Sequence, residues 1–276
     1  MKSVMLPSGE KLPALGQGSW MMGERADRRA AEIAALRTGV ELGMTVIDTA
    51  EMYGEGAAER LIGEALGAVR ERLFLVSKAY PQNASRARLA SACEASLKRL
   101  GTDRLDLYLL HWRGSVPLAE TVEAMEALKA AGKIRHWGVS NLDTDDMIEL
   151  AAAGGGGCAT NQILYNLTRR GPEHALLPWL HDHAIPVMAY SPVEQGRLLG
   201  HPALADVARN INATPAQVAL AWTMHRGSVI AIPKAGTVDH VHENRAATDL
   251  DLADTDLAAL DAAFPRPSRP RPLEML

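Results

Sequence analysis

Short runs rich in Val, Ile and Leu recur along the chain, and a stretch with helical spacing of apolar residues follows each run. We interpret eight of these runs as strands, at residues 14–18, 45–48, 73–77, 105–110, 134–140, 159–163, 185–190 and 229–232. Strands that are buried on both faces between helices are parallel and are joined by right-handed crossovers. The pattern therefore predicts an α/β fold, a closed (β/α)8 barrel of the TIM type.

One helical stretch, residues 89–100, illustrates the pattern. Ser85 could cap its start, and Gly101 could adopt the left-handed conformation after its last turn. The residues that we expect on its buried face are Leu89, Ala92, Cys93, Ser96, Leu97 and Leu100.

Three segments depart from the repeat. Residues 3–13 predict a β-hairpin that turns at 7–10 and covers the lower end of the barrel. Extra length follows Tyr190, and a Pro-rich tail occupies residues 265–276. We expect residues 1–276 to form a single barrel domain, because such barrels commonly reach this length.

The amino-acid composition indicates which kinds of binding partner to expect. The 47% hydrophobic content suits one large core, and the net charge of −4 comes from 29 basic and 33 acidic residues without long runs of one sign. We therefore expect no nucleic acid or membrane partner, but a small uncharged or anionic molecule. Cys93 and Cys158 are the only cysteines. They predict neither a disulfide framework nor a metal site, and we expect a monomer in the cytoplasm without export signal or membrane anchor.

The glycines do not predict a Rossmann fold. Gly16, Gly18 and Gly23 have the wrong third spacing, no helix follows at once, and Asp48 lies too far on for the ribose role. The glycine run at 154–157 precedes a strand, so we interpret it as a connection on the lower face.

Polar side chains follow the strands at the ends that meet at the upper mouth of such a barrel. In chain order they are Asp48, Tyr53, Lys78, His111, Ser140, Asn141, Asn161, Gln162, Tyr190, Ser191 and Lys234. Any one of them could simply be a hydrogen-bonded rim residue. The combination of Asp48, Tyr53, Lys78 and His111 at one mouth favours an active site.

These four residue types suit protonation of an oxyanion. Asp48 and Lys78 can form a buried pair, and the Lys78 ammonium is expected to lower the pKa of Tyr53 so that the phenol acts as a general acid. His111 could bond the same oxygen as a second donor. Such a set fits the addition of hydride to a carbonyl carbon.

Aromatic residues predict the pocket wall. Trp20, Tyr53, Tyr80, Trp112 and Tyr190 all fall at predicted strand ends, and we assign Trp20 and Trp112, with His111, to the substrate. The other three tryptophans, which we assign to core or helix packing, are Trp137, Trp179 and Trp222. We expect the tail to narrow the pocket little.

The segments "IDTAEMYG", "VSK", "LLHW", "KIRHWGVSN", "NQILYN", "YSP" and "IPKAGTVDHVHEN" occur in this order along the chain. Over essentially its whole length the sequence resembles the aldo-keto reductases, and "LGQGSWMMGE" is most similar to bacterial members that reduce small aldehydes such as methylglyoxal. The resemblance implies a catalytic tetrad of Asp48, Tyr53, Lys78 and His111. It also implies NADPH as the cofactor, extended across the barrel mouth.

The resemblance also implies the cofactor contacts. Ser140, Asn141 and Gln162 are similar to the residues that bond the nicotinamide carboxamide, and Tyr190 to the ring that stacks on it. The loop beside the pyrophosphate contributes Ser191, Val193, Gly196 and Arg197, the 2′-phosphate is met by Lys234, and the remaining contacts are Ala235, His240, Glu243 and Asn244. Family members often have Ser and Arg where this chain has Ala235 and His240, so weaker discrimination against NADH is expected.

Three other functions can be weighed. Lys78 or Lys234 could form a Schiff base in an aldolase, although the paired Asp48 keeps Lys78 protonated. An NADPH-binding regulatory barrel without turnover is a second alternative. A retaining glycosidase is the weakest, because its candidate carboxylates, Glu51, Glu55 and Glu59, fit a solvated helix start.

Overall fold

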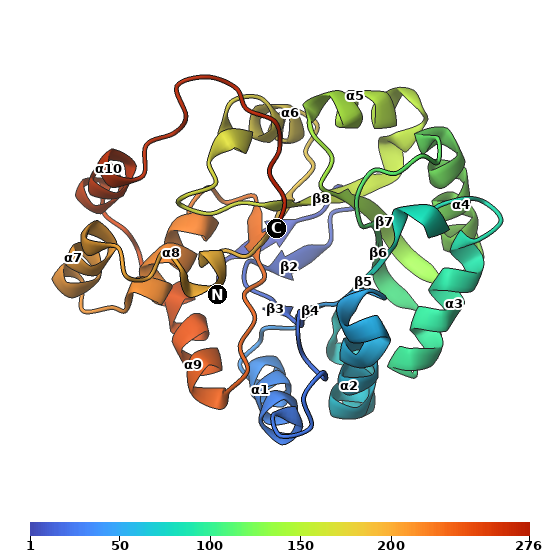
Figure 1. Ribbon diagram of the computed structural model, residues 1–276, viewed down its shortest axis with the longest axis horizontal. Helices are drawn as coiled ribbons and strands as arrows, with labels where there is room; N and C mark the ends of the chain where they lie inside the picture. Colours follow the sequence, from blue (N-terminus) through green and yellow to red (C-terminus); the bar gives the residue numbers. More distant parts are fainter.

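The computed structural model describes residues 1–276 and contains a closed barrel of eight parallel strands, seen at the centre of Figure 1. The strands are β3 Gln17–Gly18, β4 Val46–Asp48, β5 Phe74–Ala79, β6 Leu105–Leu110, β7 Ile134–Ser140, β8 Cys158–Leu164, β9 Val187–Tyr190 and β10 Val229–Ala231. Neighbouring strands follow chain order, and bridges from Leu15 to Ala231 and from Gly18 to Lys234 join the first strand to the last. The predicted (β/α)8 barrel is confirmed.

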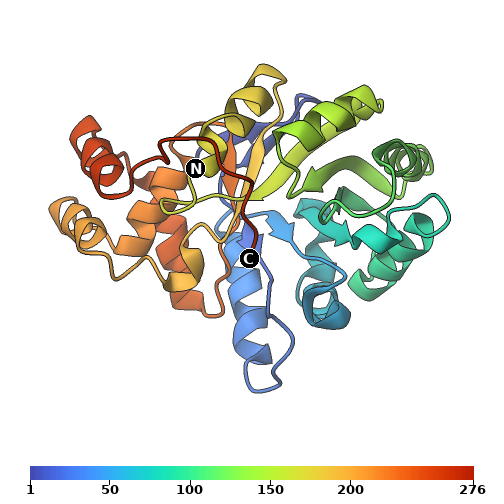
Figure 2. The ribbon, with the colours of Figure 1, turned by 45° about the horizontal axis from the view of Figure 1, so that its top comes forward.

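A helix follows each strand and packs around the outside of the barrel (Figures 1 and 2). These helices are α1 Arg29–Glu41, α2 Ala57–Leu66, α3 Leu89–Leu100, α4 Leu118–Ala130, α5 Thr144–Ala152, α6 Leu176–Asp182, α8 Pro215–Met224 and α9 Val238–Ala246. The extra length after Tyr190 contains a further helix, α7 Pro202–Asn210, and α10 Asp254–Ala263 precedes the tail. None of the helices has the length and apolar character needed to span a bilayer.

The apolar strands separate two packed cores. On β6, Leu107 and Leu109 point into the barrel, whereas Tyr108 and Leu110 pack against the helix layer. Because side chains alternate along a strand, a strand covered on both faces needs apolar residues at successive positions. This requirement explains why the strands were visible in the sequence as nearly continuous apolar runs.

Helix α3 buries the six predicted residues, but it begins at Leu89, three residues later than a cap at Ser85 would place it. Gly101 ends it in the left-handed conformation, with φ of 66°. The expected side-chain cap is wrong, because no side chain caps the first turn. Instead, residues 85–88 form a turn, and the Leu89 N–H donates to the Ser85 carbonyl over 2.9 Å.

The N-terminal hairpin pairs β1 Ser3–Met5 with β2 Lys11–Pro13 in antiparallel register and turns at 7–10 as predicted. Val4, Leu6 and Leu12 are buried in the core that fills the barrel interior. In Figure 1 the hairpin lies behind the barrel, on the side away from the viewer. The hairpin therefore closes the lower end.

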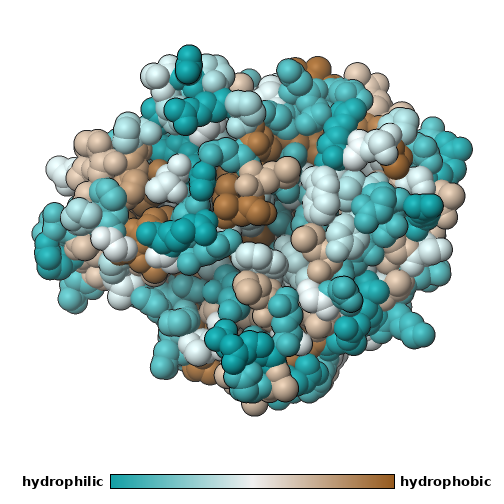
Figure 3. Space-filling view, viewed as in Figure 1, coloured by the Kyte–Doolittle hydropathy of each residue, from teal (hydrophilic) through white to brown (hydrophobic).

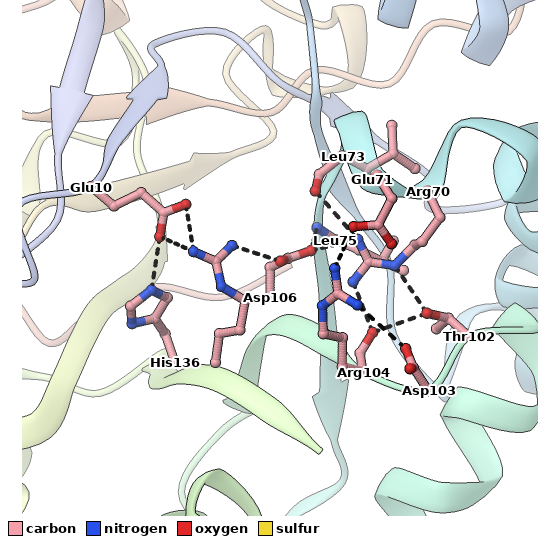
Figure 4. Close-up of polar contacts among 11 residues, drawn as sticks. Glu10, Arg70, Glu71, Leu73, Leu75, Thr102, Asp103, Arg104, Asp106 and His136 are labelled. Atoms are coloured by element: carbon pink, nitrogen blue, oxygen red, sulfur yellow. Dashed lines mark hydrogen bonds and ion pairs between the residues drawn. The ribbon is translucent and has the colours of Figure 1, made fainter. Parts of the chain in front are cut away.

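Charged side chains fasten this hairpin to the starts of the strands (Figure 4). Glu10 accepts two hydrogen bonds of 2.9 Å from Arg135 and contacts the His136 Nε2. Arg135 also bonds the buried Asp106 over 2.9 Å, and Arg70 lies 2.8 Å from the other oxygen of Asp106. The network joins the hairpin turn to the segments that enter β5, β6 and β7.

Candidate active site

Asp48, Lys78 and Tyr53 form one hydrogen-bonded chain at the upper ends of β4 and β5. The Lys78 Nζ lies 2.8 Å from the Asp48 Oδ2 and 3.1 Å from the Tyr53 hydroxyl. Tyr53 reaches this position because the chain turns immediately after β4, where the Tyr53 N–H donates to the Ala50 carbonyl and the 3-10 helix Tyr53–Gly56 begins. The turn after β4 thus brings Tyr53 next to Lys78 on the neighbouring strand β5.

Lys78 is fully buried, and its ammonium has three acceptors. They are the Asp48 carboxylate, the Tyr53 hydroxyl and, at 2.9 Å, the Thr49 carbonyl. These partners match the three protons of the ammonium. Burial disfavours the charged form of Lys78 and would lower its pKa. The neighbouring Asp48, and then Tyr53, stabilise that charge more strongly, so the pKa of Lys78 is raised.

The expected lowering of the Tyr53 pKa is wrong for this structure. Burial of the phenol raises the pKa of Tyr53, and the nearby Lys78 ammonium opposes this effect without cancelling it. Tyr53 therefore holds its proton at neutral pH. A general acid must be protonated before it reacts, so this state suits a proton donor.

His111 extends from the end of β6 into the same site. Its ring centroid lies 5.9 Å from that of Tyr53, with the two rings edge to face. Burial, with a contribution from Lys78, lowers the pKa of His111 to about 2, so the imidazole is neutral. Its Nδ1 is buried without a hydrogen-bond partner. No hydrogen bond joins His111 to Tyr53, and the neutral ring faces the cavity as a polar group.

A cavity of about 880 Å³ opens above these residues at the barrel mouth. The predicted site residues that line it are Trp20, Asp48, Tyr53, His111, Trp112, Ser140, Asn141, Gln162, Tyr190, Ser191, Val193, Gly196, Lys234 and His240. Lys78 lies beneath the cavity floor. The structure thus brings most of the sequence-predicted residues to one hollow.

Four predicted cofactor residues do not line the cavity. Ala235 and Asn244 are buried, and Glu243 is half-buried with its carbonyl accepting from Gln217. The Arg197 side chain is half exposed and forms an ion pair with Glu194. Tyr80 is also absent from the wall, because its ring lies edge-on to Trp112 with 5.9 Å between centroids.

The polar residues at the ends of β7, β8 and β9 bond one another. Tyr190 donates to the Asn141 Oδ1 over 2.9 Å, and the Asn141 amide donates to the Ser140 hydroxyl and the His111 carbonyl. Gln162 donates to the Asp48 Oδ1 over 2.8 Å. Asn161, in contrast, turns away and bonds the Leu142 carbonyl.

The loop after β9 is held by its buried carboxylate. Ser191, Glu194 and Gln195 all have positive φ, so this backbone is strained for residues other than glycine. Asn166 donates to the Ser191 carbonyl and to Glu194, and Arg169 lies 2.7 Å from Glu194. Burial alone would raise the pKa of Glu194, but bonds from Arg169, then Arg197 and Asn166, outweigh it and hold the pKa at about 2.

Lys234 and His240 lie on the side of the cavity next to α9. Both side chains are exposed, and Lys234 makes no ion pair with the protein. Thr237 caps α9, and its side chain accepts from the His240 N–H. An unpaired lysine beside a helix N-terminus is a setting that attracts anions.

The C-terminal tail crosses the mouth, contrary to the expectation that it narrows the pocket little. Figures 1 and 2 show it running from α10 over the barrel to end near its centre. The Leu273 N–H donates to Asp143, and Glu274 pairs with Arg169 over 2.6 Å. Met275 and Leu276 then line the cavity. No local pattern in the sequence predicts this path, because the tail is held by residues that lie 105 and 130 positions earlier in the chain.

Sequence reasoning also missed other wall residues. They are Gly18, Ser19, Met21, Met52, Ile232 and Pro233, whereas Pro192 and Gln195 fall within the loop 191–197 that was predicted. Several directly follow strand ends, so the rule that residues after the strands meet at the upper mouth could have found them.

Of the large apolar side chains that the protein exposes, Trp20, Met21, Met275 and Leu276 all lie at this mouth. Figure 3 shows apolar side chains beside a hollow near the middle of this face. No group of three or more His, Cys, Asp or Glu side chains is arranged to hold a metal ion.

A barrel with a buried Asp, Lys and Tyr chain beneath a mouth cavity defines a class of oxidoreductase. The chain belongs to the aldo/keto reductase family, whose family model matches residues 14–264. Methylglyoxal reductase YeaE of Escherichia coli K12 is 53% identical over 281 aligned positions, which cover 100% of this chain and 99% of that protein. An uncharacterized oxidoreductase of Bacillus subtilis, YtbE, is 33% identical over 93% of this chain and 91% of its own length.

Solved structures agree with this assignment. An aldo/keto reductase from Klebsiella pneumoniae in complex with NADP and acetate has a TM-score of 0.97 and 52% identity, covering 100% of this chain and 99% of that chain. An aldo-keto reductase from the same organism in complex with NADPH has the same TM-score, identity and coverage. The whole barrel, including the segments beyond the family match, thus has counterparts of known structure.

Proposed function

We propose that this protein reduces small aldehydes and ketones to alcohols with NADPH, and that Tyr53 donates the proton. The observation that carries the proposal is the buried chain from Asp48 through Lys78 to Tyr53, which ends in the mouth cavity. The NADP and NADPH complexes of the Klebsiella pneumoniae proteins and the name of the Escherichia coli relative support it.

The residues at the mouth fit the cofactor. Ser140, Asn141 and Gln162 offer polar atoms to a carboxamide, and the Tyr190 ring offers a flat apolar face. Lys234 is a free cation at the α9 side, where it can meet the 2′-phosphate beside His240. When bound there, NADPH supplies the hydride that adds to the carbonyl carbon.

Side chains of the protein itself carry out the proton transfer. Tyr53, protonated at neutral pH, gives its proton to the carbonyl oxygen as negative charge develops there. The ammonium of Lys78 stabilises the phenolate that remains, and Asp48 keeps Lys78 charged. His111 stays neutral and can donate a hydrogen bond to the same oxygen. Solvent then returns the proton to Tyr53.

The wall of the mouth selects the substrate by size and polarity. Trp20 and Trp112 supply flat apolar surface, and the tail residues Met275 and Leu276 complete it. We propose methylglyoxal and comparable small aldehydes as substrates, as the name of the Escherichia coli relative indicates for that protein. We also propose that the protein works as a monomer in the cytoplasm, because one chain completes the site and both cysteines are free.

The geometry disfavours an aldolase that acts through Lys78. Lys78 is fully buried with three acceptors around its ammonium, so it lacks the free amine that a Schiff base requires. Borohydride should therefore trap no adduct of Lys78 with pyruvate or dihydroxyacetone. A regulatory barrel without turnover is separated from an enzyme by the rate of NADPH consumption.

The test follows NADPH and NADH absorbance with a panel of aldehydes and ketones that includes methylglyoxal. We expect turnover with NADPH, and Tyr53→Phe should lower kcat by about 10² to 10⁴ because it removes the general acid. Binding of NADPH, measured by fluorescence titration, should change little in Tyr53→Phe. Absence of turnover in the wild type would reject the reductase, and an unchanged kcat in Tyr53→Phe would reject the assignment of the donor.

A further inference from the structure

Gln162 lies between the expected position of the cofactor and the catalytic chain. It sits on β8, it is 1% exposed, and its Nε2 donates to the Asp48 Oδ1 over 2.8 Å. Because an ionised carboxylate only accepts hydrogen bonds, the amide nitrogen must face Asp48. The amide oxygen then points elsewhere, and no protein donor bonds it. Gln162 also lines the mouth cavity, so this oxygen is available to a bound molecule.

We propose that Gln162 is a positioning residue that couples the cofactor carboxamide to the proton-donating chain. The inference rests on the proposed function. One end of the amide accepts from the carboxamide, and the other end fixes Asp48. Cofactor binding and the acidity of Tyr53 are linked through this one side chain.

The carboxylate of Asp48 explains how the link acts. Its Oδ2 accepts from Lys78 and its Oδ1 accepts from Gln162, so both oxygens are satisfied in a buried place. Without the Gln162 amide, the Asp48 Oδ1 loses its hydrogen-bond donor. The negative charge of Asp48 is then less well stabilised and interacts more strongly with the Lys78 ammonium. The ammonium of Lys78 then does less to stabilise a phenolate at Tyr53, which becomes a weaker acid.

Asn141 provides a matched control. It lines the same cavity and has the same expected contact with the carboxamide. Its own bonds go to Ser140, His111 and Tyr190, and none goes to Asp48. Asn141→Gly keeps the positive φ of 59° without strain, because glycine adopts it freely.

The experiment compares wild type, Gln162→Met and Asn141→Gly. The Kd of NADP⁺ is measured by quenching of tryptophan fluorescence, and kcat/KM for methylglyoxal with NADPH is measured across pH. Both variants should weaken NADP⁺ binding by up to about tenfold, the value of one hydrogen bond. Gln162→Met should also lower kcat at neutral pH, and it alone of the two variants should move the basic limb of kcat/KM to higher pH.

A basic limb of kcat/KM that does not move in Gln162→Met, or that moves equally in Asn141→Gly, would overturn the inference. Turnover by the wild type would still support the proposed function in that case. Wild-type protein that neither binds NADP⁺ nor turns over would instead overturn the proposed function, and this inference with it.

A binding measurement that needs no turnover gives a second test. In a double-mutant cycle, the effects of Gln162→Met and Asp48→Asn on the Kd of NADP⁺ should be non-additive, because the two side chains act as one unit. Asn141→Gly and Asp48→Asn should be additive. Additivity in both cycles overturns the coupling. Gln162→Asn, whose amide is one methylene too short to reach Asp48, replaces Gln162→Met if that variant does not fold.

Discussion

At the scale of single residues, the charge on Lys78 sets the chemistry of its neighbours. Its ammonium opposes the effect of burial on the pKa of Tyr53, and it helps to keep His111 neutral. The same charge would be costly alone in a fully buried position, and Asp48 offsets that cost. One ion pair therefore serves both the fold and the proposed proton donor.

Lys78→Met should reveal this electrostatic role. Without the ammonium, nothing opposes the burial that raises the pKa of Tyr53, so the basic limb of kcat/KM for reduction should move to higher pH while kcat falls. The variant should also lose about 3 to 5 kcal/mol of stability, because Asp48 is left unpaired. Steady-state rates across pH and denaturant unfolding measure the two effects.

The double variant Asp48→Asn, Lys78→Met is the control for stability, since it removes both charges and should recover part of the loss. A basic limb that stays in place in Lys78→Met would show that the lysine acts by position alone.

We propose that His240 sets the strength of the preference for NADPH. It lines the cavity beside Lys234, but a neutral imidazole offers at most one donor, whereas arginine offers a planar fork that matches phosphate. His240→Arg should tighten NADPH binding by about 1.5 to 3 kcal/mol at most, with little change for NADH.

Fluorescence titrations of both cofactors with wild type and His240→Arg measure this preference. His242→Arg places the same new charge on an exposed position of α9 that does not line the cavity, and it should change neither affinity. Equal gains for NADPH and NADH in His240→Arg would show that position 240 does not meet the 2′-phosphate.

At the scale of elements, the loop after β9 depends on Glu194. Three non-glycine residues of this loop have positive φ, and the bonds from Asn166, Arg169 and Arg197 to Glu194 hold them in place. Glu194→Gln should weaken NADPH binding, because Ser191, Val193 and Gly196 lose their support at the cavity. It should also lower stability at neutral pH by about 1.5 to 3 kcal/mol, typical of a hydrogen bond to a charged group.

The pH dependence of this loss has a definite sign. The pKa of Glu194 is depressed to about 2 from an ordinary value of 4.5, so its stabilising effect is present above about 4.5 and fades as pH falls towards 2. The Tm difference between wild type and Glu194→Gln should therefore be full at neutral pH and shrink below about pH 4. Glu274→Gln is the control, since its exposed pair with Arg169 should matter little. A constant Tm difference would contradict the assignment.

At the scale of the whole molecule, the charged network under the hairpin and the proposed active site lie at opposite ends of the barrel. The network of Glu10, Arg135, Asp106 and Arg70 lies at the lower end, whereas the cavity opens at the upper end (Figures 1 and 4). In such barrels the lower face contributes stability and the upper loops carry chemistry. Changes at the two ends should therefore be separable.

Asp106→Asn tests this separation. The substitution leaves Arg70 and Arg135 without their buried carboxylate, so unfolding in denaturant should become easier by about 3 kcal/mol, with kcat and KM unchanged. Glu10→Gln should cost less than about 1 kcal/mol, because that pair is partly exposed. A large fall in kcat for Asp106→Asn in folded protein would mean that the two ends are coupled.

The sequence alone determined the barrel and most of its mouth. Strands covered on both faces need continuous apolar runs, so β6 and β7 could be predicted to the residue, and β3 and β9 were placed with less accurate ends. Once the barrel was inferred, the strand ends located Asp48, Lys78 and His111 without further information. These features depend on residues that are close in sequence, and a local pattern can therefore encode them.

Only the tertiary structure decided features that depend on distant segments. The path of the tail, with Met275 and Leu276 at the cavity, is fixed by ion pairs and hydrogen bonds to residues more than a hundred positions away. The direction of the Tyr53 pKa shift followed from burial, which no motif records. The bond from Gln162 to Asp48 spans 114 residues and exists because the closed barrel brings β8 opposite β4. Local patterns fixed which side chains reach the mouth, and packing determined what each one meets there.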